Sequence, residues 1–192
     1  TAYDISACLV GSEMCIRDSY ILLFFAALFI GCAPTGVQVT FDDEKSNAIR
    51  AHYQNYLNND MEGLKSLWSP DIEMFLNSTE PVSQDELIPL LEAQHATYDI
   101  TMTWSQNGEE DLGQWVETAS YPAGAANEAV TVTQTWFNWN ATSKLTGETI
   151  NLPAHISFLW GEDGKIIQEY HNYDTTEMVA GIEAAQAAAV AE

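Results

Sequence analysis

Basic residues are scarce in this chain of 192 residues. It has 6 lysines and arginines against 28 aspartates and glutamates, a formal net charge of −22. Binding to nucleic-acid phosphates requires a basic surface, so we expect no nucleic-acid partner. A strongly acidic surface mainly keeps a protein soluble.

Recognisable catalytic and metal-binding motifs are also missing. The sequence has no nucleophile elbow, phosphate-binding loop, CxxC pair or metal-box motif, so we expect neither a cofactor nor a bound metal. Its three cysteines are Cys8, Cys15 and Cys32. Cys8 and Cys15 lie in residues 1–19, which we expect to be foreign to the protein. A lone Cys32 provides no disulfide framework.

The first 19 residues resemble the translation of a sequencing adapter. The match is carried by "LVGSEMCIRD" and extends upstream through an index region to "TAY", with a one-base mismatch at Asp4. We therefore expect residues 1–19 to be an artefact with no part in the fold.

An apolar run and a cysteine follow that segment. Residues 20–31 contain about a dozen apolar residues, fewer than the roughly 20 that cross a bilayer as a helix, so they are typical of a signal peptide. The stretch "LFIGC" resembles the lipobox of bacterial lipoproteins, which implies acylation of Cys32. The alternatives are a plain signal peptide and an anchor helix. Because no aspartate follows Cys32, we expect anchoring at the cell envelope, on the periplasmic side of the outer membrane.

The remaining chain predicts one domain after a tether at residues 32–40. The whole sequence is 46% apolar with six tryptophans, enough for a proper core. Helical periodicity in "SNAIRAHYQNYLNND", "DMEGLKSLW" and "SQDELIPLLEAQHATY" precedes alternating strand patterns from Asp99 onward. Ser83 and Glu86 have capping-box spacing. Helices followed by a meander predict an α+β domain over residues 41–178, with an Ala-rich helix or tail at 179–192.

Two stretches carry a family resemblance: "NNDMEGLKSLWSPDIEMF" and "TGETINLPAHISFLWGEDGKIIQEYHNYD". They resemble the SnoaL-like branch of the nuclear-transport-factor-2-like superfamily, and the similarity covers roughly residues 42–178. The resemblance implies a conical fold in which N-terminal helices pack on a curved, mostly antiparallel sheet that encloses an apolar pocket. Such proteins are often homodimers. The superfamily includes isomerases, cyclases, dehydratases and hydrolases, so the resemblance does not fix an activity.

The final hairpin allows a prediction of which residues face the pocket. A three-residue loop with Gly164 in the left-handed conformation pairs His155 with His171 across the two strands. We expect the inward face to be the one with apolar walls and a carboxylate at its end, which carries Phe158, Trp160, Tyr170 and Asp174. The opposite face then holds His155 and His171. Both faces cannot line the pocket unless a bulge intervenes, and a one-residue slip in the turn would also swap the pairing.

Candidate site residues follow from this choice of face. Asp174, with a pKa raised by burial, is the candidate general base, and its alternative role is to cap the helix that begins at "TTEM". His155 and His171 are the other candidate proton carriers, and with Glu169 they are a weaker metal alternative. We expect His52 and His95 to have core or rim roles. Candidate ligand contacts are Tyr53, Tyr56, Trp104, Trp136, Phe158, Trp160 and Tyr170.

Two classes of function stay open. One is an envelope-anchored protein whose pocket binds a small apolar molecule. The other is a cofactor-independent acid–base enzyme that uses Asp174 or a histidine. Because the hairpin does not place a second polar group beside Asp174, the sequence slightly favours binding.

Overall fold

The computed structural model describes residues 36–105 and 113–190. Residues 1–19, the apolar run at 20–31 and Cys32 lie outside the described residues. The described residues form one compact unit.

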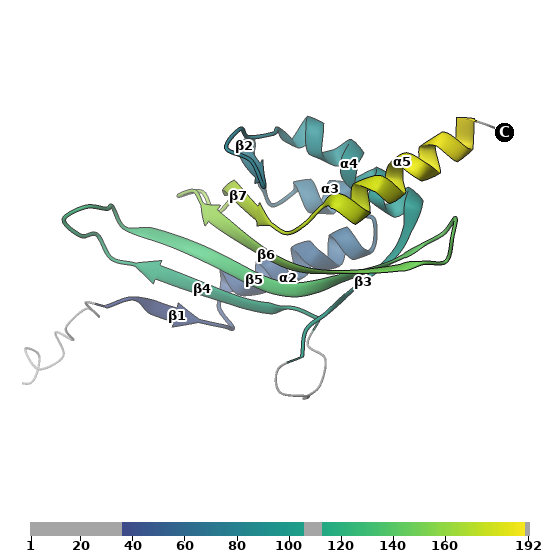
Figure 1. The fold of residues 1–192 in the computed structure, drawn as a ribbon. Helices are drawn as coiled ribbons and strands as arrows, with labels where there is room; N and C mark the ends of the chain where they lie inside the picture. The colour runs from purple at the N-terminus through teal and green to yellow at the C-terminus, as the bar shows by residue number, and fades with distance from the viewer. Residues whose placement is uncertain (1–35, 106–112, 191–192) are drawn as a thin grey trace, which may run out of the picture. The chain divides into compact units, whose positions relative to one another are not determined.

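An α+β arrangement is observed, as expected (Figure 1). The helices of the described residues are α2 (Glu44–Leu57), α3 (Met61–Lys65), α4 (Gln84–Thr97) and α5 (Thr176–Val190). The strands are β1 (Gln38–Thr40), β2 (Trp68–Leu76), β3 (Tyr98–Thr103), β4 (Trp115–Tyr121), β5 (Val130–Ser143), β6 (Thr149–Trp160) and β7 (Ile166–Asn172). No helix in this described part of the chain has both the length and the apolar character to cross a bilayer.

The strands form one curved, mostly antiparallel sheet in the order β1-β4-β5-β6-β7-β2. The long β5 pairs with β6 along one edge, while β4 and β3 follow one another along its other edge. Only the β2–β7 pair is parallel among the described strands. The short strand β1 pairs with β4, although residues 38–40 were expected to belong to a tether.

The helices cover one face of this sheet (Figure 1). Asp43 caps α2 by accepting hydrogen bonds from the backbone of Lys45 and Ser46, and the predicted capping box of Ser83 and Glu86 begins α4. Buried α2 side chains pack against alternating inward residues of β5 and β6, where Phe137 and Phe158 are at most 3% exposed. The core therefore lies between the helices and this inner sheet face.

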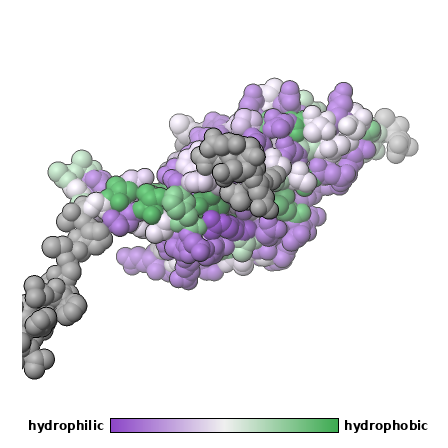
Figure 2. Space-filling view, turned by 90° about the horizontal axis from the view of Figure 1, so that it is seen from below, coloured by the Kyte–Doolittle hydropathy of each residue, from purple (hydrophilic) through white to green (hydrophobic). Residues whose placement is uncertain are grey.

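The outer surface is mostly hydrophilic with separate apolar patches. Figure 2 shows apolar surface beside the start of the described chain, where Val37, Val39 and Phe41 are each about half exposed. On the outer sheet face, Trp136 stacks on His155, with ring centroids 4.7 Å apart.

The register of the final hairpin was predicted wrongly over most of its length. Gly164 has the expected left-handed conformation, with φ of 77°, and Trp160 pairs with Ile166 as expected. Beyond this pair the strands shift by one residue, so that Leu159 pairs with Gln168 and Ile167 is the extra residue of a β-bulge. Every β7 side chain after the bulge therefore faces opposite to the prediction.

Candidate functional site

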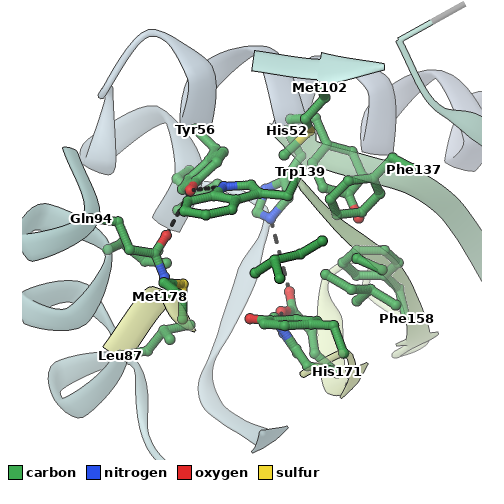
Figure 3. Close-up of a pocket in the computed structure, with 18 of the residues that line it drawn as sticks. His52, Tyr56, Leu87, Gln94, Met102, Phe137, Trp139, Phe158, His171 and Met178 are labelled. Carbon is green, nitrogen blue, oxygen red and sulfur yellow. Dashed lines mark hydrogen bonds and ion pairs between the residues drawn. The ribbon is translucent and has the colours of Figure 1, made fainter. Parts of the chain in front are cut away.

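A cavity lies between the helices and the inner sheet face. It encloses about 630 Å³, counted with the solvent at its mouth. Its apolar wall comes from α3, α4, α5 and the strands β3, β5 and β6, and it consists of Leu64, Leu87, Leu91, Met102, Phe137, Leu152, Ala154, Ile156, Phe158 and Met178 (Figure 3).

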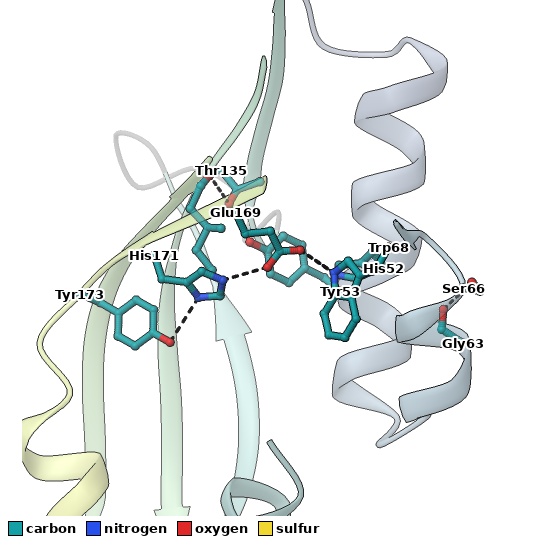
Figure 4. Close-up of polar contacts among 10 residues, drawn as sticks. His52, Tyr53, Gly63, Ser66, Trp68, Thr135, Glu169, His171 and Tyr173 are labelled. Carbon is teal, nitrogen blue, oxygen red and sulfur yellow. Dashed lines mark hydrogen bonds and ion pairs between the residues drawn. The ribbon is translucent and has the colours of Figure 1, made fainter. Parts of the chain in front are cut away.

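The bulge places Glu169 at one wall of this cavity. Glu169 is 2% exposed, and both of its carboxylate oxygens have partners. The Trp68 indole nitrogen donates to Oε1 at 2.6 Å, and His171 Nε2 lies 2.9 Å from Oε2 (Figure 4). His52 Nε2 on α2 lies 3.9 Å from Oε1, within ion-pair distance but beyond a hydrogen bond.

Glu169 is held in its ionised form. Burial, the largest effect, opposes ionisation. The hydrogen bonds from His171 and Trp68, together with the positive charge that His171 and His52 carry when protonated, outweigh it and lower the pKa of Glu169. Moving a carboxylate out of water costs several kcal/mol, and a hydrogen bond to a charged group contributes about 1.5–3 kcal/mol. The buried charge is therefore stable only because these donors surround it.

The ionised carboxylate fixes the proton position on His171. A carboxylate can only accept hydrogen bonds, so a neutral His171 carries its proton on Nε2. Its Nδ1 then carries a lone pair, and the Tyr173 hydroxyl, 3.5 Å away, donates a long hydrogen bond to it. Burial, helped by the Glu169 charge, raises the pKa of Tyr173 to about 12, so this hydroxyl stays protonated at neutral pH. The arrangement can therefore accept a proton at Nδ1 inside an apolar cavity.

His52 is a neutral neighbour of this group. Burial lowers its pKa from the ordinary histidine value, although the Glu169 charge opposes the shift. It packs edge-on against Trp68 and Phe158, with ring centroids 5.6 and 6.2 Å apart. A core or rim role was expected for His52, and the structure places it within the polar network of the pocket.

The predicted site residues separate into two groups. Tyr53, Tyr56, Phe158 and His171 line the cavity. Tyr170 does not: it is 37% exposed and stacks on Phe75 with ring centroids 4.7 Å apart. Trp136 and His155 lie on the outer sheet face, Trp160 donates to Thr133 beside α2, and Trp104 follows β3 outside the lining.

Asp174 is a helix cap and does not line the pocket. Its carboxylate accepts hydrogen bonds from the backbone and the hydroxyl of Thr176, at 2.9 and 2.6 Å. These bonds lower the pKa of Asp174, whereas the sequence argument expected burial to raise it. The alternative role, capping the last helix, is confirmed.

The metal alternative fails on geometry. His155 and His171 lie on opposite faces of the sheet because the bulge shifts only β7. Within residues 36–105 and 113–190, no group of three or more His, Cys, Asp or Glu side chains could hold a metal ion.

Sequence reasoning missed the central role of Glu169. In "KIIQEYHNYD" neither alternating set of residues stays apolar beyond Ile167. This loss of an apolar face is the signal that polar groups enter the interior there.

Comparisons with known proteins support the fold. No protein-family model matches the sequence, nor does any curated protein. Among solved structures, the chain is similar to AclR of Streptomyces galilaeus, a proposed hydroxylase, with 15% identity and a TM-score of 0.52 over 73% of this chain and 96% of that one. IdmH of Streptomyces antibioticus, a proposed polyketide cyclase, gives 16% identity and a TM-score of 0.51 over 73% and 99%. A proposed polyketide cyclase of a Silicibacter species gives 14% and 0.51 over 71% and 93%. At these identities the likeness shows the fold alone, and the described domain has the nuclear-transport-factor-2-like α+β fold.

Proposed function

We propose that this domain binds a small, uncharged and largely apolar molecule and transfers a proton on it, with His171 as the proton carrier. The observation that carries the proposal is the contact between His171 Nε2 and the buried Glu169 carboxylate at the wall of an apolar cavity. Perturbed, buried titratable groups in a cleft are characteristic of functional sites.

The step can be written in full. His171 Nδ1 takes a proton from a C–H or O–H group of the ligand, and the electron pair left behind moves into the ligand. The resulting imidazolium is stabilised by the Glu169 carboxylate at 2.9 Å and returns the proton to another ligand atom. Isomerisation, cyclisation and dehydration all need such transfers, and the proposed cyclases among the structural neighbours support this class of reaction.

The lining argues for an uncharged ligand. Among the described residues that line the cavity, none is a lysine or an arginine. Glu169 adds a negative charge to the same wall. An anionic ligand would therefore be repelled without a compensating ion pair.

A binding protein without catalysis is the second candidate. One observation favours it: Glu169 on β7 accepts from Trp68 on β2, so the carboxylate also holds together the parallel strand pair. In that case the buried network stabilises the pocket wall and has no chemical role.

A nitrobenzisoxazole separates the two candidates without knowledge of the natural ligand. A base removes its ring C–H proton, the electron pair forms a nitrile, and the N–O bond breaks to give a coloured phenolate. If His171 is the base, His171→Gln should lower the rate by at least about 100-fold, the usual contribution of a positioned general base. His155→Gln on the outer face is the matched control and should leave the rate unchanged. Equal rates in both variants, with both folded, would leave only the binding function.

We also propose that Cys32 is acylated and keeps this pocket at the bacterial envelope, on the periplasmic side of the outer membrane. The support is the "LFIGC" sequence. The stretch from Cys32 to Gln38 spans about 20 Å at full extension, so an anchored domain would stay close to the membrane.

A further inference from the structure

A second polar group of the cavity lies on a different wall from His171. Gln94 on α4 is 6% exposed and lines the same cavity as His171 on β7 (Figure 3). Its Oε1 accepts a hydrogen bond of 2.6 Å from the Tyr56 hydroxyl. That hydroxyl in turn accepts one of 2.9 Å from the Trp139 indole nitrogen.

These two hydrogen bonds determine which end of the Gln94 amide faces Tyr56. An indole N–H can only donate, so the Tyr56 oxygen accepts from Trp139. The Tyr56 hydroxyl donates its own proton to Gln94 Oε1. Burial raises the pKa of Tyr56, which keeps this proton in place. The carbonyl end of the amide therefore faces Tyr56, and the NH₂ end is the free end.

The NH₂ group is a donor in need of an acceptor. In the described part of the chain, the only hydrogen bond that the Gln94 side chain makes is the one at Oε1. The nitrogen of this NH₂ group is not sealed off from the space of the cavity, so a ligand that supplies an acceptor can reach it and form a hydrogen bond.

We propose that Gln94 is the specificity-determining residue of the pocket and donates to an acceptor oxygen of the carbonyl kind on the ligand. This inference rests on the pocket being a small-molecule site, as proposed above. A ligand hydroxyl proton aimed at Gln94 would meet a second donor. A carboxylate would find no cation in the described lining and would share the cavity with Glu169.

The test compares indanone with indane, two bicyclic molecules that differ by one carbonyl oxygen. Their dissociation constants are measured by quenching of tryptophan fluorescence in the wild type and in Gln94→Met. Gln94→Met removes the NH₂ group that donates to the indanone carbonyl. The ratio of the dissociation constants of indane and indanone should therefore fall on the order of tenfold. Leu90→Met, at an exposed position of the same helix outside the lining, is the control and should leave the preference unchanged. A preference that is the same in Gln94→Met as in the wild type overturns the inference.

A wild-type measurement guards against failure of the variant to fold. Indanone should shift the NMR signals of the Gln94 side-chain amide protons, and indane should not; equal responses overturn the inference. If this discrimination is found but the nitrobenzisoxazole is not opened, only the proton-transfer function fails. If the ring opens but the discrimination is absent, only the role of Gln94 fails. If neither indanone nor indane binds, both proposals are overturned.

Discussion

Replacing Glu169 with glutamine tests the polar network without changing its shape. The amide can still accept from the Trp68 indole through one oxygen. The second oxygen, 2.9 Å from His171 Nε2, becomes an amide nitrogen that donates. Two donors then face each other unless His171 moves its proton to Nδ1.

The expected loss of stability follows from the lowered pKa of Glu169. A lowered pKa means that the donors stabilise the charged form by more than burial penalises it, so neutralising the group must destabilise the fold. Two hydrogen bonds to a charge, at about 1.5–3 kcal/mol each, become neutral ones of about 0.5–1.5 kcal/mol. After the offsetting relief of desolvation, we expect the free energy of unfolding to fall by about 1–3 kcal/mol. The melting temperature should fall by about 2–4 °C per kcal/mol.

The pH dependence gives a second check on Glu169. Because its folded pKa lies below the unfolded value of about 4.3, its contribution is fully present above that pH and is lost as pH falls through the folded pKa. The difference between wild type and Glu169→Gln should therefore shrink in acid. Urea unfolding at neutral and acidic pH measures it. Glu73→Gln, at an exposed carboxylate on β2, is the control and should change stability by less than about 0.5 kcal/mol. A Glu169→Gln protein as stable as the wild type at neutral pH would refute this reasoning.

Three further predictions concern other parts of the chain. Gly181→Ala should destabilise the domain by about 1–3 kcal/mol in thermal unfolding, because the added methyl group collides with the Tyr98 hydroxyl that donates to the Met178 carbonyl. The buried His52 should contribute stability fully above about pH 6.5 and lose it as pH falls through its lowered folded pKa, so the pH slope of unfolding below 6.5 should decrease in His52→Leu by up to about 1.4 kcal/mol per pH unit. Radiolabelled palmitate should be incorporated into the expressed protein and not into Cys32→Ser; equal labelling of both would remove the lipid anchor.

Local chemistry made several elements predictable from the sequence. The capping box at Ser83 and Glu86 and the left-handed Gly164 depend only on neighbouring residues, and both are present. The apolar face of α2, with Ile49, Tyr53 and Tyr56 buried, follows from helical spacing. The family resemblance also led to the correct fold class, because the sequence pattern predicts the order of helices and strands.

The site depended on a long-range feature that the sequence does not display. Ile166 is fully buried and its backbone nitrogen bonds to Leu67, so its placement is set by packing against β2, distant in the chain. The bulge at Ile167 lets β7 satisfy this contact, and it turns Glu169 and His171 inward and Asp174 outward. A prediction that assumes simple alternation along the hairpin therefore assigns the wrong β7 side chains to the pocket.

Strand β1 was missed for a similar reason. Gln38–Thr40 has only three residues, all exposed, and it pairs with residues 118–120 of β4. Such a short edge strand has no hydrophobic alternation for a pattern to detect.

Glu169 holds His171 with its proton on Nε2 and leaves Nδ1 as the base that we propose for the pocket. ¹⁵N NMR of the imidazole ring of the neutral His171 tests this arrangement. We expect a protonated Nε2 and an unprotonated Nδ1 in the wild type, with the two exchanged in Glu169→Gln. A wild-type ring protonated on Nδ1 and bare on Nε2, or a ring that does not respond to Glu169→Gln, would contradict it.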